Sequence, residues 1–182
     1  DPIEYYHKHK KAIVTQREIG EDTNSYADGL RMALRQDPDV VLVGEMRDLE
    51  TTSAAMTAAQ TGHLVFGTLH TIDAIQTISR IIDLYPPHQQ PLVRIQLAES
   101  LKAVISQRLL PRVKGGRVPA IEILIVTGHV RKMIEENNSS QITQACAKGQ
   151  FYGMQTFNQS LVKLFKDGLV TEEEVLAAAS SP

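Results

Sequence analysis

The chain has 182 residues, of which 42% are hydrophobic and 22% charged, and its formal net charge is -2. This composition is typical of a globular protein with a hydrophobic core, and so small a net charge gives no basic field that would favour nucleic acid. A single cysteine, Cys146, excludes an internal disulfide and a cysteine-based zinc site, so we expect a reducing compartment. No apolar run approaches the roughly 20 residues needed to cross a bilayer.

The start of the chain has neither an initiator methionine nor the layout of a signal peptide. We interpret the sequence as a fragment of a longer protein. Residues 12–15 predict a short strand, and residues 23–36 predict a helix with Tyr26 and Leu30 on its apolar face. Asp37 ends this helix because a residue before proline is pushed out of the helical region.

Residues 40–43 predict a strand of four apolar residues without alternation. Such a strand is expected to be buried on both faces of a parallel sheet. Asp48 is expected to cap a helix that runs to about residue 61, and residues 64–66 predict the next strand. A helix capped by Asp73 and another over about residues 91–106 follow.

The pattern changes after this region. Residues 109–113 and 120–126 flank a Lys-Gly-Gly-Arg turn, which predicts an antiparallel hairpin. From Gly128 onward the pattern is helical. We therefore predict an α/β fold with a mostly parallel sheet, an antiparallel hairpin and a C-terminal helical subdomain, divided into domains 1–127 and 128–182.

Glu45 stands just beyond the carboxyl end of the predicted strand 40–43. Ligands of open α/β sheets bind at that edge. A carboxylate there can hold a magnesium-bound water or orient the water that attacks a phosphate. The segment is also compatible with a buried strand followed by a helix cap and exposed charges, so the residues alone leave both interpretations open.

Two histidines bracket the next predicted strand. His63 precedes it, and a structural role is the simpler interpretation. His70 follows it, and its imidazole could donate a hydrogen bond to a terminal phosphate. Thr68 adds a small hydroxyl suited to a polar site. Because no cysteine is near and the histidines lack helical i, i+4 spacing, the pattern argues against zinc.

Glu4 follows what we interpret as the end of another strand. We therefore expect Glu4, Glu45 and His70 to lie beyond consecutive strands and to gather around one pocket. This convergence carries more weight than any of the segments alone.

Three segments, in this order, closely resemble the secretion ATPase superfamily that drives type IV pili and type II secretion. Residues 1–4 resemble the end of its aspartate box, residues 39–48 its Walker B segment, and residues 61–71 its histidine box. The Walker B residues are Val41, Leu42, Val43, Gly44 and Glu45. The likeness extends over most of the chain.

Within the superfamily, the sequence is most similar to the pilus retraction ATPases. Extension and type II secretion ATPases usually carry a four-cysteine zinc module, which a chain with only Cys146 lacks. The tail, residues 155–161 and 166–171, is also similar to retraction ATPases. An extension or type II secretion ATPase without its zinc module remains the alternative.

Two departures from the family stand out. Its signature helix is matched here by Arg131, Ile134 and Glu136, but Glu135 stands where the family has its second arginine. The family's phosphate loop, Gly-x-x-x-x-Gly-Lys-Ser/Thr, lies upstream of the aspartate box and does not occur in this sequence. A non-catalytic assembly domain is therefore a further alternative.

The resemblance implies a RecA-like fold and a cytoplasmic, homohexameric motor at the inner membrane that hydrolyses ATP to retract a type IV pilus. Its implied partners are the inner-membrane platform protein and the pilus base, with no nucleic acid. In the complete protein, Glu45 and Glu4 would act on the attacking water and on Mg²⁺, which Glu45 holds through water. His70 would sense the γ-phosphate, supported by His63 and Thr68.

Overall fold

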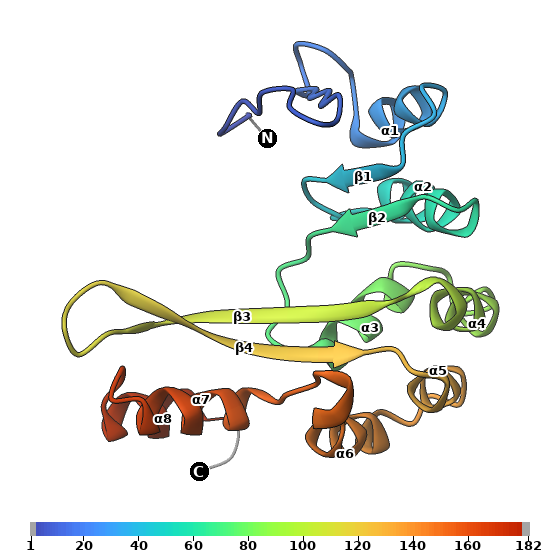
Figure 1. The fold of residues 1–182 in the computed structure, drawn as a ribbon. Coiled ribbons are helices and arrows are strands. Elements are labelled where there is room, and N and C mark those ends of the chain that lie inside the picture. Colours follow the sequence, from blue (N-terminus) through green and yellow to red (C-terminus); the bar gives the residue numbers. More distant parts are fainter. Residues whose placement is uncertain (1–2, 180–182) are drawn as a thin grey trace. The chain divides into compact units, whose positions relative to one another are not determined.

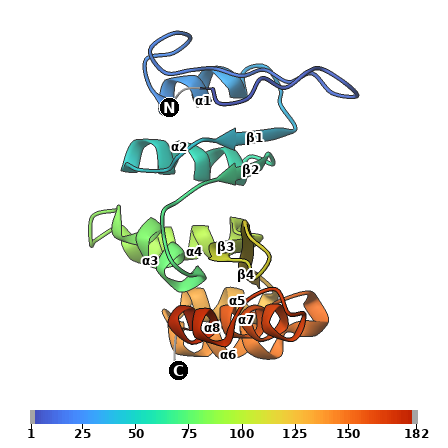
Figure 2. The ribbon, with the colours of Figure 1, turned by 90° about the vertical axis from the view of Figure 1, so that its left-hand side faces the viewer.

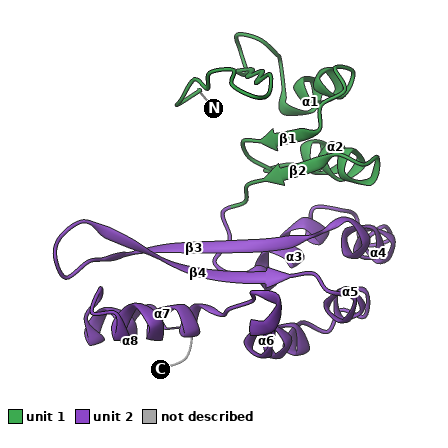
Figure 3. Ribbon diagram, viewed as in Figure 1, with its two compact units in different colours: residues 1–69 green, residues 70–182 purple. Residues whose placement is uncertain are grey.

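The computed structural model describes residues 3–179, and the chain divides into two compact units, residues 1–69 and 70–182 (Figure 3). Asp1 and Pro2, which begin the predicted aspartate-box segment, lie outside the described residues. The predicted domain boundary at residue 128 does not coincide with this division, because the helices after it pack on the hairpin within the second unit. The functional division into catalytic core and helical subdomain stays a prediction.

The first unit combines a parallel pair of strands with two helices (Figure 1). Its elements are α1 (Tyr26–Leu34), β1 (Val40–Val43), α2 (Leu49–Gln60) and β2 (Leu64–Gly67). The core joins Leu30 of α1 and Ala55 of α2 to Val41 and Val43 of β1. The predicted parallel strands and helices of this half are therefore confirmed, and the bounds of β1 match the predicted ones.

Two details of the prediction are wrong. β1 is buried on one face only, since Val40 and Leu42 are exposed and the core lies against the face of Val41 and Val43. Residues 12–15 form no strand. In this segment, Val14 N donates a hydrogen bond to the ring of His9.

The caps that begin the helices of this unit follow the sequence closely. Ser25 accepts a hydrogen bond from Asp28 N at the start of α1. Asp48, the predicted cap of α2, accepts from Thr51 N at 2.8 Å and from the Thr51 hydroxyl at 3.1 Å. Since these side chains satisfy backbone donors that the helices cannot pair, the Asp48 cap fixes the start of α2 at Leu49, four residues after Glu45.

The second unit is built around a long antiparallel hairpin, as predicted, with helices packed along it (Figures 1 and 2). The strands pair from Ala103 opposite Ile125 to Pro111 opposite Arg117. The elements are α3 (Ala74–Asp83), α4 (Gln90–Ser100), β3 (Ala103–Pro111), β4 (Arg117–Ile125), α5 (Gly128–Glu135), α6 (Ser139–Lys148), the 3-10 turn η1 (Gln150–Tyr152), α7 (Phe157–Lys166) and α8 (Glu172–Ala178).

The helix predicted over residues 91–106 ends earlier, and β3 begins earlier than expected. Leu101 and Ile105 match a helical spacing, but residues 104–106 also alternate between buried and exposed positions, as a strand requires. Pairing with β4 satisfies the backbone hydrogen-bonding groups of this segment, so the segment forms a strand.

The core of the second unit joins the hairpin to α7. Leu110 and Ala120 of the hairpin pack with Phe157, Leu161 and Leu164 of α7. Both views show α7 and α8 running beside the hairpin (Figures 1 and 2). The C-terminal helices therefore share one hydrophobic core with β3 and β4.

Cys146 of α6 is a buried residue of this unit. Its Sγ lies 3.4 Å from the carbonyl oxygen of Ile123 and 3.5 Å from that of Gln155. Burial, with a smaller contribution from the negative charge of Glu122, raises the pKa of the Cys146 thiol to about 11. The thiol therefore stays protonated and unreactive at neutral pH, as befits a small core residue.

Leu161→Ala should lower the free energy of unfolding by about 2–5 kcal/mol, because it empties a fully packed position in the shared core. Leu161 is 2% exposed, whereas Val162, the next residue of the same helix, is 48% exposed. Val162→Ala is thus a matched control, with an expected loss under about 1 kcal/mol. Urea denaturation measures both, and equal losses would contradict the described position of α7.

Candidate functional site

Glu45 is a buried carboxylate just beyond the carboxyl end of β1. It is 7% exposed, and its Oε2 lies 2.5 Å from Nη2 of Arg47, whose side chain is 70% exposed. Because an unpaired buried charge is costly, the guanidinium offsets the loss of hydration at the carboxylate. The carboxylate of this ion pair is therefore buried, and its guanidinium partner faces solvent.

Tyr26, the first residue of α1, belongs to the same electrostatic neighbourhood. Burial raises the pKa of the Tyr26 phenol, the negative charge of Glu45 raises it further, and Arg47 lowers it. The raised pKa keeps the phenol protonated at neutral pH. The sequence placed Tyr26 only on the apolar face of a helix, and its spacing from Glu45 gave no signal of this role.

The ends of β1 and β2 are tied together next to Glu45. Met46 N donates to the carbonyl of Thr68 at 3.0 Å, and the Thr68 hydroxyl donates to the carbonyl of Gly44. The sulfur of Met46 lies where a Cβ at Gly67 would stand, so a larger residue here would displace the Met46 side chain. Thr68 thus helps fix the backbone on either side of Glu45, while its predicted place near a phosphate stays a prediction.

His63 lies at the other end of the strand pair. Its Nδ1 is 3.0 Å from the carbonyl of Ala58 and 3.2 Å from the hydroxyl of Thr61, at the end of α2. Since β1 and β2 are parallel, His63 precedes β2 at the end away from Glu45. These contacts support the structural interpretation of His63, and a part in phosphate sensing stays a prediction.

The two other predicted catalytic residues are exposed. Glu4 lies in the first unit, and His70 is the first residue of the second. The loop after His70 is held where the hydroxyls of Thr71 and Thr77 meet at 2.7 Å. The predicted meeting of Glu4, Glu45 and His70 around one pocket stays a prediction.

The residues that match the signature helix divide by burial. Ile134 of α5 is fully buried, whereas Arg131 and Glu136 are exposed. Glu136 lies 3.8 Å from the ammonium of Lys132, one helical turn away. The helix thus anchors through its apolar residues and presents its charges to solvent. The coupling role of these residues stays a prediction.

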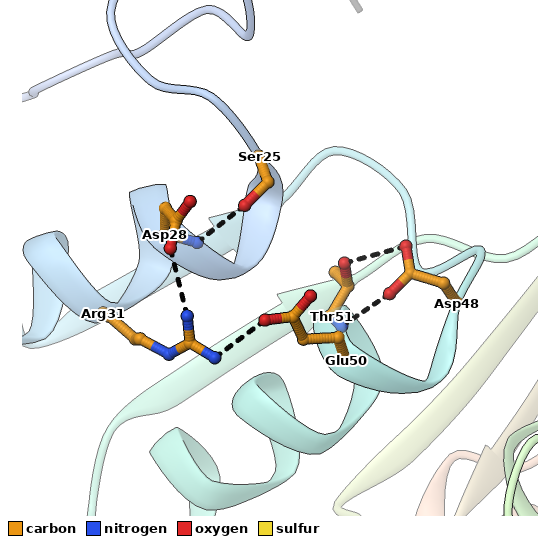
Figure 4. A network of polar contacts seen from close by, with 6 residues as sticks. All are labelled: Ser25, Asp28, Arg31, Asp48, Glu50 and Thr51. Atoms are coloured by element: carbon orange, nitrogen blue, oxygen red, sulfur yellow. Dashed lines mark hydrogen bonds and ion pairs between the residues drawn. The ribbon is translucent and has the colours of Figure 1, made fainter.

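An exposed ion-pair network connects α1 with α2 (Figure 4). The guanidinium of Arg31 lies 3.0 Å from Asp28 on its own helix and 2.8 Å from Glu50 at the start of α2. The adjacent cap, Asp48, fixes the same first turn of α2. The first turn of α2, which follows Glu45 in the sequence, is therefore fixed by its cap and tied to α1.

Residues 1–115 match the family model described as "Type II/IV secretion system protein". The chain belongs to this family. It is 49% identical over all 182 residues to the type IV pilus retraction ATPase PilT of Pseudomonas aeruginosa, of which it covers 53%. A twitching motility protein of Neisseria gonorrhoeae is 53% identical over 174 residues, which are 95% of this chain and 46% of that protein.

The solved structure of the pilus retraction motor PilT with bound ADP superposes on this chain with a TM-score of 0.92. The two are 56% identical, and the match covers 100% of this chain and 51% of that one. This confirms the predicted secretion ATPase fold. The chain spans about half the length of the relatives that it matches.

Among residues 3–179, no group of three or more His, Cys, Asp and Glu side chains is placed to hold a metal ion. None of the helices in this described part combines the length and the apolar character needed to span a membrane.

Arg47→Met should lower the melting temperature more than Arg31→Met does. The first change strips the guanidinium from a buried carboxylate, whereas the second removes ion pairs between exposed groups, which stabilise little. Thermal unfolding followed by circular dichroism compares the two. Equal effects would show that Glu45 does not depend on Arg47.

Proposed function

We propose that the complete protein is an ATP-hydrolysing motor that retracts a type IV pilus, and that this chain supplies its Walker B glutamate and histidine box. The observation that carries the proposal is the buried Glu45 at the carboxyl end of β1, in a chain 49% identical along its whole length to a named retraction ATPase. Ligands of α/β sheets bind at this edge, which supports the assignment.

Phosphoryl transfer needs positioning and charge compensation more than covalent chemistry. Glu45 would orient the attacking water, and Arg47 would hold the carboxylate in place. Glu4 would assist at the same water, and His70 would donate a hydrogen bond toward the γ-phosphate. Thr68, through its hydroxyl bond to Gly44, would keep the backbone around Glu45 from shifting.

Mg²⁺ fits the side chains at this site. Mg²⁺ in nucleotide enzymes takes one or two carboxylates and completes its shell with water and phosphate oxygens. A single buried carboxylate, Glu45, is such a donor, and it would hold Mg²⁺ through water. When bound, the ion would neutralise the charge that develops on the phosphates.

The grip on the phosphates would come from outside these 182 residues, because this sequence contains no Gly-x-x-x-x-Gly-Lys-Ser/Thr loop. The complete protein would act as a homohexamer in the cytoplasm, docked at the inner membrane against the platform protein at the pilus base. The charged, exposed side of α5, with Arg131 and Glu136, would transmit the motion to these partners.

Glu45→Gln in the full-length protein should lower kcat for ATP by about 10²–10⁴-fold, because the amide cannot accept a proton or carry the charge. The KM for ATP should change little, since the phosphates are gripped elsewhere. Glu50→Gln, which alters an exposed carboxylate on α2, is the matched control. Undiminished turnover in the Glu45 variant would remove this residue from the mechanism.

The missing phosphate loop also favours a second candidate, in which this polypeptide is a non-catalytic assembly domain. Calorimetric titration of ATP with Mg²⁺ separates the two. We expect no measurable binding to the 182-residue chain and binding at micromolar concentrations to the full-length protein. Micromolar binding of ATP to the 182-residue chain would contradict the non-catalytic candidate. The absence of ATP binding to the full-length protein would contradict the proposed motor function.

The direction of force is tested in cells. A strain that lacks the gene should keep its surface pili and lose twitching motility, because assembly continues without retraction. Electron microscopy of pili and a motility assay on agar measure these outcomes. A strain without pili would instead identify an extension ATPase.

A further inference from the structure

We propose that Glu122 and Arg108 of the hairpin are positioning residues that couple the loop after His70 to the C-terminal helices α7 and α8. Both residues lie in the second unit, outside every motif that the sequence singled out. Neither touches the proposed reacting atoms, so each would act through the segments that it holds. For its activity readout, this inference rests on the proposed ATPase function.

Glu122 of β4 holds the beginnings of two helices. Its Oε1 accepts a hydrogen bond from Ala74 N, the first residue of α3, at 2.8 Å. The backbone amide of Phe157, the first residue of α7, also faces this carboxylate closely enough to lower its pKa. Since helix N-termini carry partial positive charge and unpaired N–H groups, one carboxylate serves two helices that are far apart in the sequence.

Arg108 of β3 connects the same two regions from the opposite strand. Its Nη2 donates to the carbonyl of Ile72, two residues after His70, at 3.3 Å. Its Nη1 donates to the carbonyl of Ala178, the last residue of α8, at 3.2 Å. The guanidinium also lies 4.4 Å from the ring centre of Phe157. One side chain thus contacts the histidine-box loop, α7 and α8.

The two link residues are neighbours on the hairpin. Arg108 pairs with Ala120 across the strands, and Glu122 pairs with Ser106, so the two side chains lie diagonally on one face. Burial raises the pKa of Glu122, the Ala74 amide lowers it, the Asp73 carboxylate raises it, and the Phe157 amide and Arg108 lower it. Burial has the largest effect, so the pKa of Glu122 is raised overall, and the contacts with α3, α7 and Arg108 offset part of the cost of its charge.

Coupling follows from this shared dependence. A displacement of α7 removes the Phe157 amide from Glu122 and the Phe157 ring from Arg108, and a displacement of α8 removes the Ala178 carbonyl from Arg108. Either loss would weaken the hold of these two side chains on Ile72 and Ala74. A load on the C-terminal helices would therefore change the position of the loop that carries His70. By linkage, a change at that loop would alter the hold on α7 and α8 to the same extent.

The test combines Arg108→Met and Glu122→Gln in the full-length protein with hydrogen exchange. In Arg108→Met, the rate of amide exchange should rise about tenfold in residues 74–78 and, to a similar extent, in residues 157–179. A change of this size is expected when one charge-assisted hydrogen bond is lost. Glu122→Gln retains its shape but has only one acceptor oxygen, and it should give a smaller rise in both segments. Arg112→Met, at an exposed position beside the turn, should change neither.

Kinetics distinguish positioning from general structure. Arg108→Met should lower kcat for ATP about tenfold with an unchanged KM. Arg108→Lys should recover only part of the lost kcat, because an ammonium cannot reach both carbonyls as the two guanidinium nitrogens do. Exchange that rises in one segment alone, or turnover that stays at the wild-type level, would overturn the link. If exchange couples while the wild-type protein hydrolyses no ATP, the proposed function fails and the link stands.

Discussion

The candidate site depends on a carboxylate that is withdrawn from water. Glu45 is buried at the end of β1, and the close guanidinium of Arg47 offsets part of its lost hydration. The backbone on either side is fixed by the Thr68 bonds, and the helix that follows is fixed by Asp48. Each of these features limits where the carboxylate can point, which is what the positioning of water requires.

In the second unit, apolar packing and polar contacts together position the helices on the hairpin. Its helices share a core with the hairpin through Leu161 and its neighbours, and this packing is indifferent to exact direction. The polar contacts of Glu122 and Arg108 add direction, because hydrogen bonds to helix ends and to single carbonyls fix both distance and angle. Apolar burial thus supplies stability, and the polar link determines how the helices are placed.

The sequence predicted the features that depend on local chemistry. An unbroken apolar run set the bounds of β1, the Asp48 side chain set the start of α2, and a double-glycine turn marked the hairpin. It failed where tertiary contacts decide. Residues 101–106 fit a helix and a strand equally well until β4 pairs with them, and no spacing connects Tyr26 with Glu45 or Glu122 with Ala74. The position of His70 relative to Glu45 remains a prediction for the same reason.

The two buried carboxylates differ in what their partners can do. Glu122 is held by backbone amides of α3 and α7, which cannot leave without moving whole helices, so its place is structural. Glu45 is held by the guanidinium of Arg47, an exposed side chain with several rotatable bonds. Such a partner can yield to water or to a hydrated cation at a small conformational cost. A carboxylate with an exchangeable partner would suit the catalytic role that we propose for Glu45, whereas the partners of Glu122 suit a positioning role.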